Sequence, residues 1–327
     1  MLPGTIFGNE NSSPILFDGE NPVGMAVSAD GEDLVLAFGR YETEFGSYSP
    51  FLMRYGLYPG EGGDVTRASM EPADLELGFD VGMIAFTPAG TLLACTTQYV
   101  IDEVDLGGGI VELRIEWQES EEVVTVLRFI PVMNPLSVAV HGDVIAVGLS
   151  RTDNDDFSGY QYIKTFSYEN GDLMGVFTDI GADICCVDSI SGLRFAPDGS
   201  HIIAATNLPG HLAVFTVDGA FVKTIGDDVN MATGYPFYSD VGFAPSGEVV
   251  AVGAYQNSNQ QPAAYVFDLE TGDLVRQWDL PGPTPDYPEK RLHAQALAFA
   301  YGQLLVLGQV FEFGNPGFFG GKVLVYH

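Results

Sequence analysis

Acidic side chains recur at matching places in the sequence, each just ahead of a run of apolar residues. They are Glu20 in GENPVG, Asp80 in FDVG, Asp188 in VDSISG and Asp240 in YSDVG, with His293 at the corresponding place in RLHAQA. Carboxylates that converge can hold a hard cation such as Ca²⁺ through oxygen ligands, or raise one another's pKa as in an acid–base pair. Solvated acids that cap strand ends are the alternative. The sequence predicts Asp80, Asp188 and Asp240 as a candidate metal set, with Ca²⁺ as the one candidate cofactor.

Other catalytic patterns are missing from the sequence. It contains no G-x-S-x-G elbow, no H-E-x-x-H pair, no P-loop and no Rossmann fingerprint, and its five histidines are scattered along the chain. We therefore expect no catalytic residue and a protein that is not an enzyme.

The elements that would position these side chains follow from an internal repeat. Residues 193–226 read as strand, Pro-Asp-Gly turn, strand, loop, strand, Asp-Gly turn and strand. The first hairpin recurs about every 50 residues, and each copy places small and β-branched residues on both sides of a tight turn. The turns fall near Gly31, Gly90, Gly142, Gly199, Gly247 and Gly302.

A second hairpin follows the first in five of the six repeats, with turn sequences such as GGG, ENGD and ETGD. In the second repeat we expect this hairpin in YVIDEVDLGGGIVELRIEW. Four antiparallel strands at this period are typical of a β-propeller blade, whose bare faces are covered by neighbouring blades. The predicted fold is an all-β, six-bladed β-propeller with four-stranded blades, spanning residues 1–327 as a single domain.

The last repeat stops at its third strand, GKVLVYH, and a candidate for the missing fourth strand lies at the other end of the chain. Residues 4–9, GTIFGN, are similar to KTIGDD at residues 223–228. We expect this N-terminal strand to complete the last blade, which would remove an open sheet edge and close the ring.

The repeat units FAPDG…HLAVFTVDGAFVKTIG and FAPSG…AAYVFDLETGDLVRQW resemble those of NHL and YVTN-type propellers. The resemblance covers nearly the whole chain and implies a toroid that binds proteins, RNA or glycans on its loop-rich face. A likeness to six-bladed lactonases would imply a metal held in the channel by Glu, Asn and Asp, with the Asn in a Ser-Asn-Gly-Leu context. Here Ile190 and Ser191 stand in place of that Ser and Asn, which weakens the metal site that the likeness implies.

Long second-to-third connections of the predicted blades are rich in aromatic and small polar residues. They are residues 39–50, 150–161, 254–263 and 310–321. Rigid aromatic rings with small polar neighbours suit recognition surfaces, although the rings could instead pack over their own loops. The predicted ligand- or partner-binding residues are Tyr41, Phe45, Tyr48, Phe157, Tyr160, Tyr255, Phe311, Phe318 and Phe319.

Charge narrows the classes of partner. The chain has 44 acidic and 13 basic residues, a net charge of −31, which opposes binding to nucleic acid and to anionic lipid. Such a surface is suited to a high-salt setting, where screening shortens the range of the charge repulsion. A soluble acidic surface with no salt adaptation is the alternative. No signal peptide or apolar span is visible, so we expect a soluble protein at a virion or cell surface, or in the cytoplasm of a salt-adapted host.

Together these features favour a non-catalytic recognition or scaffold propeller, a component of a larger assembly such as a virion or cell-surface structure, that binds a protein or glycan. The alternative is a metal-dependent propeller hydrolase or lactonase that uses an acidic channel mouth. A cytoplasmic hub that binds a peptide on the same face remains open as well.

Overall fold

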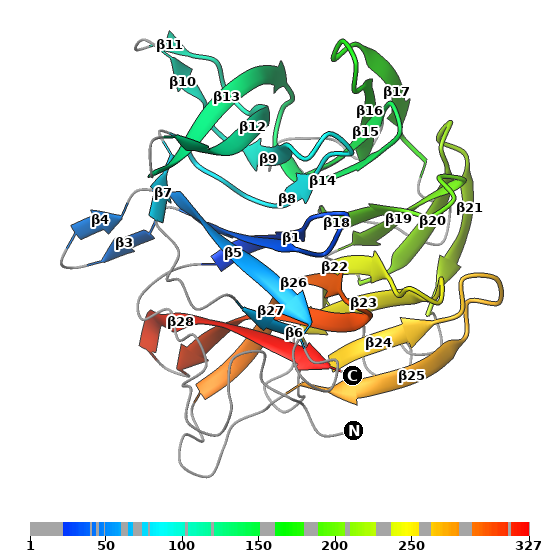
Figure 1. Cartoon of the computed structure of the whole chain (residues 1–327). Helices are drawn as coiled ribbons and strands as arrows, with labels where there is room; N and C mark the ends of the chain where they lie inside the picture. Colours follow the sequence, from blue (N-terminus) through cyan, green and yellow to red (C-terminus); the bar gives the residue numbers. More distant parts are fainter. Residues whose placement is uncertain are drawn as a thin grey trace.

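The computed structural model describes residues 22–326, apart from positions 40, 44–45, 49, 60–64, 68–73, 78, 102–103, 119–120, 151–160, 180–188, 207–209, 227–236, 255–262, 281–289 and 313–314. The described chain forms antiparallel sheets arranged around a common axis (Figure 1). None of its helices is long and apolar enough to cross a bilayer, as far as the described residues go.

The first two sheets come from the first 131 residues. The first joins β1 (Pro22–Val27), β2 (Asp33–Phe38) and β5 (Phe51–Pro59), and both β6 (Val65–Arg67) and β7 (Asp74–Glu76) pair with β5. The second runs in the order β8 (Ile84–Phe86), β9 (Leu92–Thr96), β12 (Gly109–Gln118) and β13 (Glu121–Pro131).

Three four-stranded sheets follow, each in simple chain order. They are β14 (Pro135–His141), β15 (Val144–Leu149), β16 (Ile163–Ser167) and β17 (Leu173–Phe177); β18 (Ile190–Phe195), β19 (His201–Thr206), β20 (Leu212–Thr216) and β21 (Phe221–Ile225); and β22 (Phe237–Phe243), β23 (Val249–Ala254), β24 (Ala263–Phe267) and β25 (Leu274–Asp279). The last sheet has three strands, β26 (Lys290–Ala300), β27 (Gln303–Glu312) and β28 (Asn315–Tyr326).

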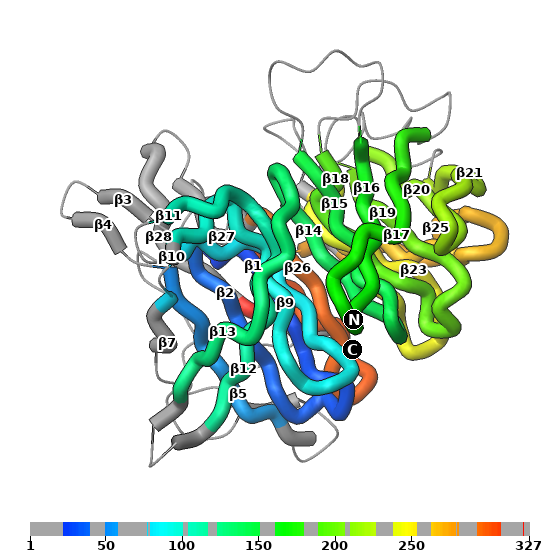
Figure 2. The backbone as a smooth tube through the Cα atoms, turned by 90° about the horizontal axis from the view of Figure 1, so that it is seen from above, coloured from blue at the N-terminus to red at the C-terminus, as the bar shows by residue number. Residues whose placement is uncertain are grey.

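The first strand of each sheet lies nearest the axis. These inner strands contact one another in the order β1, β8, β14, β18, β22 and β26, and β26 in turn contacts β1 (Figure 1; Figure 2 gives the view turned by 90°). The prediction of an all-β propeller with antiparallel blades is confirmed. The described residues contain five sheets of four or more strands and one of three. They therefore show five complete blades, where the sequence predicts six. Residues 4–9, the predicted closing strand, lie outside the described residues.

The inner hairpins form where the repeat predicts them, because each turn has a glycine in the left-handed region. All six turn glycines have positive φ, for example 78° at Gly90 and 71° at Gly199. A side chain is disfavoured in this conformation, so glycine allows the chain to reverse tightly between two apolar strands.

Apolar side chains between adjacent sheets form the core. Ala139 and Ala146 of one sheet pack in one cluster with Ile190, Ile202 and Phe215 of the next, and all are buried. A fully buried large apolar side chain contributes about 1.5–3 kcal/mol. Each sheet is therefore stabilised by its neighbours in the ring.

The second hairpin of the second sheet differs from its prediction. Residues 100–118 do not form one blade hairpin around the GGG turn: β10 (Val100–Ile101) and β11 (Val104–Asp105) pair only with each other, and β12 pairs with β9 and β13. Burial accounts for the difference, because Val104 is exposed while Val111 and Leu113 of β12 are completely buried. The long apolar alternation of β12 and β13 thus outweighed the local turn signal.

Candidate functional site

Two pockets lie on the axis of the ring, one at each end of the inner strands. We call the pocket where the inner strands begin the entry pocket and the pocket where they end the exit pocket. The entry pocket has a volume of about 540 Å³ and is lined by Val23, Gly82, Met83, Leu136, Ser191, Tyr238, Ser239, His293 and Gln295. The exit pocket has a volume of about 450 Å³. Both volumes fall in the range of small-molecule sites.

Each inner strand or the residues just before it contribute to the entry pocket. Val23 comes from β1, Leu136 from β14 and Ser191 from β18, while Gly82 and Met83 directly precede β8. The repeat therefore brings together residues that are more than 200 positions apart in the sequence. The described lining is apolar with a few neutral polar groups, the composition expected of a site for a small organic molecule.

His293 is the histidine in the entry pocket's described lining. Burial lowers the pKa of its imidazole below the ordinary value of 6.5, so the ring is neutral at pH 7. Its Nδ1 lies 3.0 Å from the side-chain amide nitrogen of Gln295, on the same strand. An amide N–H donates, so in this arrangement Nδ1 accepts and Nε2 carries the ring proton.

The hydroxyl of Ser191 is engaged by the protein. It lies 2.5 Å from the carbonyl oxygen of Tyr238 in the next sheet and 3.2 Å from that of Ala205. Its proton is thus used to join two sheets, and the oxygen can only accept from a ligand. These contacts make Ser191 a weak candidate for a nucleophile, since its proton already has a carbonyl acceptor in the protein.

The sequence predicts Asp240 to be a metal ligand at the channel mouth. The structure corrects this prediction. Its side chain is completely buried. Its Oδ1 accepts the backbone N–H of Val241 at 2.8 Å, and its Oδ2 accepts that of Leu297 at 3.0 Å and lies 3.2 Å from Nη2 of Arg194. Burial raises the pKa of Asp240, and Arg194 and the two N–H groups oppose that rise.

The carboxylate thus connects three inner strands, because Arg194 lies on β18, Asp240 on β22 and Leu297 on β26. Gly192 permits this approach, since a Cβ there would lie 2.7 Å from the Cα of Asp240. The role of Asp240 is structural, in an ion pair that joins adjacent sheets.

The other members of the predicted metal set do not join Asp240. Asp80 is half-buried and is not part of the entry pocket's described lining, while Asp188 and Glu20 lie outside the described residues. Within the part of the chain that the structure describes, no group of three His, Cys, Asp or Glu side chains could hold a metal ion. The described donors therefore do not fit the predicted calcium site.

The predicted aromatic connections are partly paired strands rather than irregular loops. Tyr41 lies opposite Tyr48 in the hairpin of β3 (Tyr41–Thr43) and β4 (Gly46–Tyr48), and Phe311 lies opposite Phe318 where β27 pairs with β28. Phe319 is also within β28. The alternating polar and aromatic residues of these segments suit strands. The remaining predicted residues, Phe45, Phe157, Tyr160 and Tyr255, lie outside the described residues.

Sequence reasoning missed most of the entry pocket. It placed His293 at a strand entry but did not find Gln295, Ser239 or Tyr238. One signal was available for the opposite end of the axis: Arg194 occupies a position that alanine or glycine holds in the other five repeats.

Comparisons with known proteins support the fold. No protein-family model matches the chain, and no curated protein sequence matches it. Solved structures with a similar fold include the following two. One is a gluconolactonase from Xanthomonas campestris, with a TM-score of 0.55, 14% identity, and coverage of 95% of this chain and 88% of that one. The other is hydrazine synthase from Kuenenia stuttgartiensis, with a TM-score of 0.52, 12% identity, and coverage of 94% and 80%. At these identities the likeness shows the fold alone.

Proposed function

We propose that the entry pocket binds an uncharged small molecule and that the protein hydrolyses it, the substrate being a lactone or a related ester. The observation that carries the proposal is a neutral histidine, His293, in a mainly apolar pocket on the propeller axis. The fold shared with a gluconolactonase supports the same class of substrate. Both observations favour a propeller hydrolase or lactonase, the alternative that the sequence left open, over a non-catalytic recognition propeller.

The neutral state of His293 determines its proposed role. With Gln295 donating to Nδ1, the ring carries its proton on Nε2, and this N–H is the proposed donor to the carbonyl oxygen of a bound ester. Negative charge grows on that oxygen as water attacks the carbonyl carbon and gives up a proton to solvent, so a donor placed there stabilises the transition state more than the ground state. The ester C–O bond then breaks, and the leaving oxygen takes a proton from solvent. Loss of one such donor typically lowers kcat by about 100-fold or more.

Ligand size and polarity follow from the rest of the pocket. Val23, Met83 and Leu136 provide apolar contact, while Ser239 and the lone pairs of Ser191 offer hydrogen bonds to hydroxyl groups. A charged substrate would find no opposite charge among the described lining residues, which favours an uncharged ring. The proposed roles fall on His293 and the described lining of the pocket.

The experiment is hydrolysis of glucono-δ-lactone and dihydrocoumarin by the purified protein at pH 6–9. We expect His293→Gln to lower kcat by about 100-fold and Val23→Phe to raise KM by narrowing the pocket. Val222→Ser, on the exposed outer strand β21, is the matched control and should leave both constants unchanged. Absence of hydrolysis by the wild-type protein, or full activity of His293→Gln, would refute the proposal.

A second candidate function, recognition of a protein or glycan, is favoured by the paired arms at the entry side. β3 and β4 form one arm, and β27 and β28 remain paired out to Glu312 and Asn315. Such arms present a firm surface at low entropic cost. Their proposed setting is a larger assembly, such as a virion or cell surface at high salt. Isolation of the native protein as a free monomer, with no binding to a glycan array, would count against it.

We further propose that the three-stranded sheet is a sixth blade, which residues 4–9 complete. Without a fourth strand, β28 would leave an unpaired edge. Deletion of residues 1–10 should then lower the melting temperature of the whole protein, and unchanged melting would contradict this closure.

A further inference from the structure

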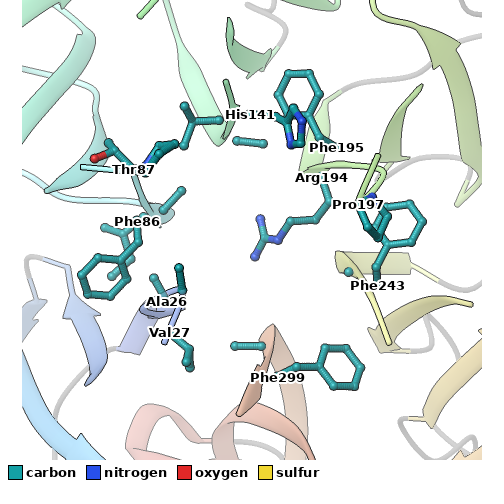
Figure 3. A pocket seen from close by; sticks show the side chains of 18 of the residues that line it. Ala26, Val27, Phe86, Thr87, His141, Arg194, Phe195, Pro197, Phe243 and Phe299 are labelled. Atoms are coloured by element: carbon teal, nitrogen blue, oxygen red, sulfur yellow. The ribbon is translucent and has the colours of Figure 1, made fainter. Parts of the chain in front are cut away.

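The exit pocket is built by all six inner strands at the end opposite the entry pocket. Its lining includes Val27, Phe86, Phe195, Phe243 and Phe299, and the labelled rings in Figure 3 lie around a centre into which Arg194 extends. Four phenylalanines occupy the same position of four repeats, directly before or close to the tight turn, and the other two repeats have Val27 and Val140 there. The repeat thus places an apolar, largely aromatic collar around the axis.

In each inner strand, one residue directly precedes the collar residue. This residue is small in five repeats and is arginine in one. The small residues are Ala26, Ala85, Ala139, Gly242 and Ala298, and all five line the exit pocket. In the fourth repeat the residue is Arg194, whose side chain extends into the space that the others leave open (Figure 3). A single guanidinium group therefore lies on the axis, inside the aromatic collar.

The hydrogen bonds of Arg194 can be counted. One Nη1–H donates to the carbonyl oxygen of Leu193 at 2.8 Å, and Nη2 lies 3.2 Å from Oδ2 of Asp240 and 3.5 Å from the carbonyl oxygen of Leu297. A guanidinium has five N–H donors. The Nε–H and the second Nη1–H have no acceptor among the residues that the structure describes. The pocket therefore contains donors without protein acceptors, fixed in position by an ion pair.

Charge selects the kind of acceptor. Asp240 already balances the charge of Arg194. Exposed carboxylates stand beside the pocket's turns at Asp30, Asp143 and Asp198, and hydrogen bonds from Ser28 and Ser200 lower the pKa values of Asp30 and Asp198 respectively. An anion would approach against these charges and would lie close to the buried Asp240. A neutral carbonyl oxygen accepts the same hydrogen bonds without that cost.

We propose that the exit pocket is a second ligand site, for an uncharged aromatic compound whose carbonyl oxygen accepts hydrogen bonds from Arg194. The aromatic collar packs against the ring system of the ligand, and Arg194 selects the carbonyl group. The site is independent of the proposed hydrolysis, because its lining shares no residue with that of the entry pocket.

The test uses Prodan, an uncharged naphthyl ketone whose emission reports both the polarity around it and hydrogen bonding to its carbonyl. We expect saturable binding of one molecule per chain. Ala298→Phe fills the exit pocket and should weaken binding at least tenfold, while Val23→Phe, the matched change in the entry pocket, should leave the affinity unchanged. Arg194→Met should weaken binding about tenfold and shift the emission of bound Prodan to shorter wavelength, because the carbonyl loses its donor.

Two analogues test the chemistry. 2-Dimethylaminonaphthalene lacks the carbonyl, and 6-dimethylamino-2-naphthoate carries a negative charge; both should bind at least tenfold more weakly than Prodan. Arg194→Met leaves Asp240 without its partner; if this variant does not fold, Ala298→Phe, which keeps the ion pair, decides. Equal effects of Ala298→Phe and Val23→Phe, no saturable binding, or tighter binding of the naphthoate would overturn the proposal.

Discussion

Substitution of Asp240 by asparagine separates a structural carboxylate from a metal ligand. Asparagine offers one oxygen where aspartate offers two, so a donor among Val241 N–H, Leu297 N–H and Arg194 loses its acceptor and Arg194 loses its counter-charge. Removing one partner of a buried ion pair costs about 3–5 kcal/mol. The Arg194 side chain is 23% exposed, so water can hydrate part of it, which places the loss near 3 kcal/mol.

The expected change in melting temperature follows from the size of the chain. An unfolding entropy of about 2.1 cal/mol/K per residue gives about 0.7 kcal/mol/K for 327 residues, so about 3 kcal/mol lowers Tm by about 4 °C. Differential scanning calorimetry, with and without 1 mM Ca²⁺ or EDTA, measures it. Asp80→Asn is the matched control and should change stability by less than about 0.5 kcal/mol.

Two outcomes would refute this reasoning. One is an Asp240→Asn protein that melts like the wild type. The other is a wild-type Tm that rises with Ca²⁺ and loses that rise in both variants, as expected if Asp80 and Asp240 were ligands of one ion.

Three further predictions concern packing and protonation. Glu112→Leu should cost about 3 kcal/mol, because this buried carboxylate accepts hydrogen bonds from Thr91 Oγ1, Tyr168 OH and Arg128 Nε at 2.6–2.9 Å; a loss below about 1 kcal/mol in urea unfolding would contradict it. Gly192→Ala should destabilise by about 1–3 kcal/mol, since its Cβ would meet the backbone of Asp240 at 2.7 Å, and crystallography of the variant should show β18 and β22 moved apart. Because burial lowers the pKa of His293 in the folded state, the unfolded chain binds the proton more tightly, so this residue's contribution is constant well above pH 6.5 and stability falls as pH drops through that value. His293→Gln should flatten that part of the stability–pH curve, and an unchanged curve would show that the ring is not buried as a neutral group.

The propeller could be predicted because its signals are local. Each inner hairpin carries its own turn glycine and its own pair of apolar strands, so a single repeat is enough to predict the hairpin. Where local signals conflicted, the prediction failed: the glycines at 107–109 indicated a blade turn, but the burial of Val111 and Leu113 in β12 decided the pairing. Burial depends on the adjacent sheets, which a single repeat does not contain.

The site could be predicted only in part, because its side chains are paired across sheets. Asp240 was assigned from its place ahead of an apolar run, but its partner Arg194 lies 46 residues earlier and on another sheet. Nothing in the local sequence around either residue indicates that they meet. The entry pocket is similar, since Ser191 and Tyr238 come together only once β18 and β22 are side by side.

The chain has few basic residues, and three of them form ion pairs between strands. With 13 basic against 44 acidic residues, most carboxylates have no positive partner, yet three partly buried arginines each hold one. Arg54 pairs with Asp33 between β5 and β2, Arg128 with Glu112 between β13 and β12, and Arg194 with Asp240 between β18 and β22. Water and salt screen the exposed carboxylates but reach these pairs poorly. These three arginines therefore lie where partial burial leaves a carboxylate in need of a counter-charge, and salt acts mainly on the unpaired charges of the surface.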